Sequence, residues 1–135
     1  MRRAALLLAA LSYVTVGVLH FTSAATFVAI MPPYIPLWLH LPAVYLSGAA
    51  EIAGGAGLLV PRFRRAAGWG ILMLLVAVFP ANIHMAVNKV GLPGMPVNEA
   101  LLWARLPLQF VMAAWVWWVA LRDATPAERG EDAGI

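Results

Sequence analysis

Long apolar runs separated by short polar stretches make up most of this chain. Four of these runs approach or exceed the roughly 20 residues that a helix needs to cross a bilayer. They cover residues 6–27, 42–60, 66–86 and 99–121. The pattern predicts an all-α membrane protein in which residues 1–121 form one transmembrane domain, a bundle of four helices.

The arginines outside the apolar runs gather at both ends of the chain and between the second and third runs, whereas the loop after the third run has only Lys89. These residues are Arg2, Arg3, Arg62, Arg64, Arg65, Arg122 and Arg129. Lys and Arg in short loops stay on the cytoplasmic side of a membrane. We therefore predict that both termini are cytoplasmic, and that residues 122–135 form a polar cytoplasmic tail too poor in large apolar residues to fold by itself. The first 25 residues also fit a cleaved secretory signal, which would leave three spans.

The overall composition agrees with a membrane protein and removes several classes of function. Hydrophobic residues make up 63% of the chain and charged residues 11%, far from the soluble average of about a half and a quarter. The net charge of +3 follows from topology and lipid headgroups, and no basic stripe with interleaved aromatics suggests nucleic acid. Cysteine is absent, so a disulfide, a thiol nucleophile and a thiolate metal site are excluded. Any redox role needs a bound cofactor.

The first loop, "MPPYIPLWLHLP" at residues 31–42, contains four prolines in twelve residues. Proline lacks a backbone donor and restrains the residue before it. The loop is therefore predicted to be extended or turned rather than helical and to cap the outer mouth of the bundle. His40 is expected to be solvated in or beside this loop.

Six polar residues stand inside the predicted spans, and all six fall in the outer half of the membrane when each residue advances 1.5 Å. They are Glu51 and Gln109 near the midplane, His20 and Arg105 in the outer third, and Asn82 and His84 near the outer interface. In the inner half, Ser12, Tyr13 and Thr15 are expected to bond their own helix backbone.

Two prolines inside the spans account for part of this polar half. Pro80 frees the carbonyl of Val76, and Pro107 frees that of Trp103, so each is expected to kink its helix. Two kinks would splay the outer end and make room for polar side chains. Asn82 then either bonds a freed carbonyl or faces a pocket, whereas His84, about 200° further around the helix, points elsewhere.

Glu51 and Arg105 carry charge at a depth where an unpaired charge costs several kcal/mol, so each needs a partner or a water-filled cavity. Three interpretations stay open: a structural ion pair between the second and fourth spans, a ligand site on the same pair, or a proton path. Glu51 could also stay protonated, since burial disfavours its charged form. His20 either forms an interhelical hydrogen bond or joins the site. A haem held by His20 and His84 is not expected, because their depths differ by about 6 Å.

Several motifs in order resemble the DoxX-like family of small bacterial membrane proteins, over roughly residues 17–118. The motifs are "HF" at 20–21, "MPPYIP" at 31–36, "SGAAEIAGGAGLL" at 47–59, "PRFRRAAGWG" at 61–70, "FPANIHMA" at 79–86 and "RLPLQF" at 105–110. The resemblance implies a four-helix bundle in the bacterial cytoplasmic membrane. His20, Glu51, Asn82, Arg105 and Gln109 stand where that family usually has the same residues. His84 replaces the usual tyrosine, and "HFTSA" lacks the proline that often follows the "HF" pair.

The resemblance also directs the functional hypothesis. The family's name comes from a subunit associated with a thiosulfate:quinone oxidoreductase, and other members are linked to membrane redox or detoxification complexes. We therefore expect a ligand pocket formed by His20, Glu51, Asn82, Arg105 and Gln109 that binds a lipid-soluble, quinone-like molecule. Arg105, Gln109 and Asn82 would donate hydrogen bonds, and Glu51 or His20 would exchange a proton.

Other functions remain open at this stage. The chain could be a non-catalytic accessory subunit, or a small transporter acting as a homo-oligomer. The expected partners are membrane lipid, a lipid-soluble small molecule and a partner membrane or redox subunit, with no nucleic acid. No metal cluster and no set of catalytic residues can be recognised, so the sequence does not decide whether the protein is an enzyme.

Overall fold

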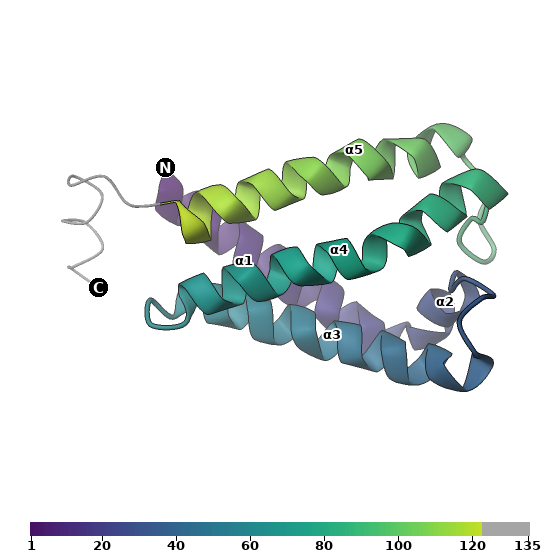
Figure 1. The fold of residues 1–135 in the computed structure, drawn as a ribbon, viewed down its shortest axis with the longest axis horizontal. Coiled ribbons are helices and arrows are strands. Elements are labelled where there is room, and N and C mark those ends of the chain that lie inside the picture. Colours follow the sequence, from purple (N-terminus) through teal and green to yellow (C-terminus); the bar gives the residue numbers. More distant parts are fainter. Residues whose placement is uncertain (123–135) are drawn as a thin grey trace.

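A computed structural model describes residues 1–122, and the tail predicted from Arg122 onward lies almost entirely outside these residues. Within them every regular element is a helix, so the all-α prediction is confirmed (Figure 1). The elements are α1 (Arg2–Thr22), α2 (Ala24–Ala29), α3 (Leu37–Leu59), α4 (Arg64–Asn88), α5 (Glu99–Val116) and a π-helical end, η1 (Trp117–Leu121).

Three helical segments of the described chain are long and apolar enough to cross a membrane. They are α1, α4 and the continuous segment Glu99–Leu121 formed by α5 and η1. The helix α3 has 23 residues but is not among them, because His40, Glu51 and several glycines lower its mean hydropathy. Three of the four predicted spans are thus long and apolar enough to cross a membrane, and the four-span arrangement stays a prediction.

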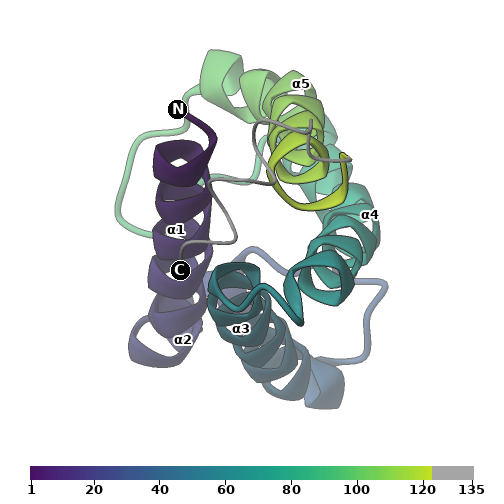
Figure 2. The same ribbon diagram turned by 90° about the vertical axis from the view of Figure 1, so that its left-hand side faces the viewer.

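The four long helices lie side by side and place both ends of the described chain together. Figure 2 looks at one end of the molecule and shows α1 beside α3 and α4 beside α5. At this end the guanidinium Nη2 of Arg2 donates to the carbonyl of Arg122 at 2.8 Å. Toward the opposite end, α4 and α5 diverge from α1 and α3, and α2 and the longer loops lie there (Figure 1).

Glycines bring α1 and α3 into backbone contact. A Cβ on Gly17 would lie 2.7 Å from the carbonyl oxygen of Gly48, and one on Gly55 would lie 2.7 Å from that of Ala10. No real side chain tolerates such distances, so these positions need glycine. Small residues allow this approach between helices in lipid, and here it places His20 of α1 directly against α3.

The packed core fills the end where the termini meet. Leu58, Ile71, Val116 and Val119 are almost completely buried there, together with Tyr13. A much smaller cluster of Met85, Ala86 and Leu102 lies toward the other end. The helices are therefore closely packed at the end where the termini meet and lie further apart at the opposite end.

The predicted first span is broken. Its helix ends at Thr22, Ser23 has φ −127° and ψ 35°, and a separate six-residue helix α2 follows. Thr22 and Ser23 are weak helix formers. Hydropathy, on which the predicted span 6–27 is based, contains no information about such a break. The change of direction places α2 at the end of the molecule where α4 and α5 diverge from α1 and α3, called the wide end below.

The proline-rich first loop is shorter than expected. Helix α3 begins at Leu37, with Pro36 at its N-cap and Pro42 inside it, so the prediction that residues 31–42 are non-helical is wrong for the second half. Proline is compatible with the start of a helix, where its missing donor is of no consequence. Within the helix Pro42 removes one backbone hydrogen bond.

His40 is buried rather than solvated, with 6% of its surface exposed. Its Nε2 donates to the carbonyl of Ile35 at 2.8 Å. Because α3 starts before His40, the side chain turns back toward the loop and bonds a carbonyl that precedes the helix. The prediction of a solvated His40 is therefore wrong.

Candidate functional site

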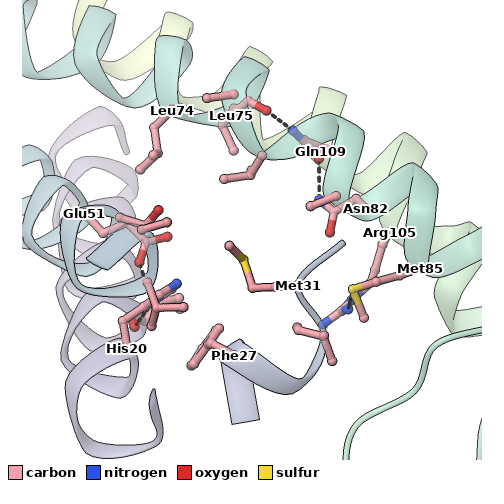
Figure 3. A pocket seen from close by; sticks show the side chains of 18 of the residues that line it. His20, Phe27, Met31, Glu51, Leu74, Leu75, Asn82, Met85, Arg105 and Gln109 are labelled. Atoms are coloured by element: carbon pink, nitrogen blue, oxygen red, sulfur yellow. Dashed lines mark hydrogen bonds and ion pairs between the residues drawn. The ribbon is translucent and has the colours of Figure 1, made fainter. Parts of the chain in front are cut away.

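A pocket of about 450 Å³ lies at the wide end, between the α1–α3 pair and the α4–α5 pair. Its walls are mostly apolar. All five residues expected to form a ligand site border it, namely His20, Glu51, Asn82, Arg105 and Gln109. Figure 3 shows them on opposite walls, with Met31 between them. A pocket of this volume, apolar with a few converging polar groups, has the usual character of a small-molecule site.

One wall is formed by His20 and Glu51. The imidazole Nδ1 lies 2.9 Å from the carbonyl oxygen of Val16 and 3.0 Å from Glu51 Oε2. Both oxygens can accept, and Nδ1 carries at most one hydrogen, so it can donate to only one of them at a time. Among residues 1–122 no hydrogen bond to Glu51 Oε2 is formed. This oxygen is itself buried, although Glu51 as a residue lines the pocket.

Phe27 of α2 stacks on the imidazole of His20, with ring centroids 3.8 Å apart and an angle of 21° between the planes. The helix break at Ser23 makes this contact possible. Sequence reasoning missed Phe27, as it missed Met31 and Met85, because an apolar residue in an apolar run carries no signal of its own. The stacked ring fixes the orientation of His20 at the pocket.

The opposite wall contains two amides in series. Gln109 Nε2 donates to the carbonyl of Leu75, and Asn82 Nδ2 donates to Gln109 Oε1 at 2.7 Å. The sequence offered a bond from Asn82 to the carbonyl of Val76, freed by Pro80, as one alternative. That alternative is wrong here, because Asn82 bonds Gln109, and Gln109 bonds the neighbouring carbonyl.

Arg105 has an unusual partner for a guanidinium in an apolar region. Its Nη1 lies 3.5 Å from the thioether sulfur of Met85, which is a weak acceptor. Among the described residues no carboxylate pairs with it, since Glu51 lies across the pocket beside His20 (Figure 3). The predicted ion pair between Glu51 and Arg105 is therefore wrong. The glycine contacts between α1 and α3 direct Glu51 toward α1 instead.

His84 lies outside the pocket, as expected. Its ring meets Tyr34 edge to face with centroids 6.0 Å apart, and its Nδ1 lies 3.0 Å from the amide nitrogen of Asn88. Asn82, two residues earlier, borders the pocket. The prediction that these two residues face different ways is confirmed, and His20 and His84 do not share a site.

The inner half holds one polar group that sequence reasoning misjudged. Ser12 bonds the carbonyl of Leu8 at 2.7 Å, as expected of a hydroxyl close to its own helix. The hydroxyl of Tyr13 is buried and has no hydrogen-bond partner among residues 1–122. A phenol hydroxyl stands too far from its own backbone to behave as serine does, so the expectation is wrong for Tyr13.

No group of three or more His, Asp and Glu side chains in the described part of the chain lies close enough to hold a metal ion. Comparison with protein families identifies the family of the chain. A family model described as a domain of unknown function, DUF8561, matches residues 8–120. No curated protein and no solved structure matches the chain.

Proposed function

We propose that this chain, which belongs to the DUF8561 family, is a multi-pass membrane protein that binds a small lipid-soluble molecule with a polar head, of the quinone type. The ligand would occupy the pocket between α1, α3, α4 and α5. The observation that carries the proposal is the pocket itself, an apolar space with hydrogen-bonding groups on two facing walls. The resemblance to the DoxX-like family supports a quinone among such molecules.

The chemistry of the two walls suits a ligand with polar atoms at separate positions on a ring. The carboxyl group of Glu51 lies in one wall, and Arg105 in the other has only a thioether acceptor among the described residues. Buried polar groups normally have partners, and leaving one without them costs about 1–3 kcal/mol. A bound molecule that satisfies both walls would therefore gain affinity from each.

The proposal includes four membrane crossings, with α3 as the fourth, and cytoplasmic termini in the bacterial inner membrane. Six arginines of the described chain flank α1, α4 and η1 near the end where the termini meet, and the opposite end contains Lys89, paired with Glu99 at 3.0 Å. The positive-inside rule then orients the pocket toward the periplasmic side. Lipid or periplasmic molecules would reach it from there.

A second candidate function is that of a non-catalytic accessory subunit, which one observation favours. The polar side chains also join helices: His20 contacts Glu51 between α1 and α3, and Asn82 bonds Gln109 between α4 and α5. Such contacts between helices in lipid contribute to stability without any ligand. In this case the pocket would be a consequence of packing.

Extraction of the purified protein with organic solvent, followed by chromatography and mass spectrometry, distinguishes the two. We expect a quinone-type molecule in near-stoichiometric amount from the native chain. Ala43→Phe should abolish it, because Ala43 lines the pocket, whereas Ala49→Phe, on the exposed side of α3, should not. Equal ligand content in both variants, or none in the native chain, would favour the accessory subunit.

A further inference from the structure

The two amides on the α4–α5 wall have their orientation fixed by the backbone. The carbonyl of Leu75 can only accept, so Gln109 must present its Nε2 to it. The Oε1 of Gln109 then faces Asn82, so Asn82 must donate to it from Nδ2. Each amide in this series has one possible orientation, although amides are otherwise easily reversed.

Asn82 is the last group of the series, and the orientation of Gln109 determines the orientation of its amide. With its nitrogen toward Gln109, its oxygen points away from Gln109, on the side of the cavity (Figure 3). The pocket therefore presents an amide acceptor whose character does not change with pH. Gln109 bonds the protein through both its nitrogen and its oxygen, so it has a positioning role. Each amide nitrogen has a second hydrogen, and the sequence-based expectation that Asn82 and Gln109 donate to the ligand stays a prediction.

We infer that the pocket selects the hydroxyl-bearing form of its ligand, a quinol or phenol, over the corresponding quinone. The inference rests on the proposed function and adds which form is bound. A hydroxyl can donate to the Asn82 oxygen, whereas a quinone carbonyl at the same place would set two acceptors against each other. An unmet buried acceptor is penalised more than a hydrogen bond is rewarded.

Arg105 does not cancel this preference. Its guanidinium donates, and both a quinone carbonyl and a phenolic oxygen have lone pairs that accept from it. Contact with Arg105 is thus common to the two forms, whereas a hydrogen bond to the Asn82 oxygen is open only to the form that carries a hydroxyl. The difference between the two forms therefore lies at this oxygen, which favours a ligand with a donor.

The test uses the full chain in detergent under anaerobic conditions with three probes: decyl-p-benzoquinol, its dimethyl ether and decyl-p-benzoquinone. We expect the quinol to bind at least about tenfold tighter than the other two, a difference of about 1.4 kcal/mol. The dimethyl ether is larger than the quinol, whereas the quinone is not. If both bind more weakly than the quinol, size cannot explain it, and the missing hydroxyl donor does. Equal binding of quinol and quinone, or tighter binding of the quinone, overturns this inference and leaves the proposed function standing. Absence of binding by all three overturns both.

The role of Gln109 is tested by the ratio of the quinone and quinol dissociation constants. Gln109→Met leaves Asn82 in place but releases its amide, so the ratio should fall from about tenfold toward about one. Val111→Met introduces the same side chain on the exposed side of α5 and should keep the native ratio. A purely structural effect would weaken both probes alike. An unchanged ratio in Gln109→Met would refute the positioning role.

Discussion

Asn82 and His84 stand two positions apart on α4 and have different surroundings. Asn82 belongs to the amide series of the pocket, and its loss would leave Gln109 Oε1 without a donor. His84 lies beside Tyr34 and Asn88, outside the pocket. At the scale of single residues, the depth of a side chain and its direction on the helix therefore decide whether it reaches the pocket.

We predict that Asn82→Leu lowers the stability of the protein in detergent by about 1–2 kcal/mol, the cost of a hydrogen bond lost between helices. His84→Tyr should change stability by less than about 0.5 kcal/mol, because tyrosine has the same apolar body and polar tip at an interfacial position. Thermal melting of both purified variants measures this. A larger loss for His84→Tyr would contradict the placement of the two side chains.

A second residue-scale prediction concerns the partner of Glu51. Double-mutant cycles of thermal stability should give a coupling energy of at least about 0.5 kcal/mol between His20→Gln and Glu51→Gln, since these side chains are in contact. Glu51→Gln and Arg105→Gln should be additive within about 0.5 kcal/mol, because the pocket separates them. Coupling of Glu51 to Arg105 instead of His20 would show that the two walls meet in solution.

At the scale of elements, the contact between α1 and α3 positions one whole wall of the pocket. A Cβ on Gly48 would lie 2.6 Å from the Cβ of His20 and 2.9 Å from the carbonyl oxygen of Gly17. These atoms belong to helices and cannot yield as the end of a flexible side chain does. The spacing of the helices, and with it the contact of His20 with Glu51, depends on this glycine.

Gly48→Ala should therefore destabilise the protein by about 1–3 kcal/mol through overpacking. Gly70→Ala is the matched control on α4, where a Cβ would meet no atom within 4 Å. It should be neutral or stabilising by up to about 1 kcal/mol, because alanine favours a helix more than glycine does. Melting temperatures of the two variants test the close approach, and similar losses in both would argue against it.

The whole molecule combines a closed, cationic end with an open, polar end. The core of Leu58, Ile71, Val116 and Val119 lies at the closed end, and the pocket lies at the open end. Large apolar side chains such as Leu46, Met73 and Val76 are exposed on the outer surface, which is compatible with a surface that contacts lipid. Charge and packing thus divide the molecule along the same axis.

This division predicts the orientation in the membrane. A reporter that is active only in the periplasm should be silent when fused directly after Arg122 and active when inserted beside Lys89, because Lys and Arg are retained on the cytoplasmic side. Enzyme activity of the two fusions in intact cells is the measurement. The reverse pattern would place the open end of the pocket on the cytoplasmic side.

The sequence by itself determined the helical class and the polar residues of the pocket. Hydropathy located the apolar segments of α1, α4 and α5, because burying backbone in lipid requires helices whatever their neighbours are. Depth along each helix placed His20, Glu51, Asn82, Arg105 and Gln109 in the same half, and the structure arranges them around one cavity. Rise per residue is a local property, so it can be read from the chain.

Only the tertiary structure decided which of these residues are partners. Charge favoured a pair between Glu51 and Arg105. The close approach of α1 and α3 at their glycines instead places Glu51 in contact with His20. The series from Leu75 through Gln109 to Asn82 depends on the rotation of α4 and α5 about their axes, and the stacking of Phe27 on His20 depends on the break at Ser23. Partner choice follows from distances between helices, and those distances are set by small residues and helix breaks that hydropathy and charge do not register.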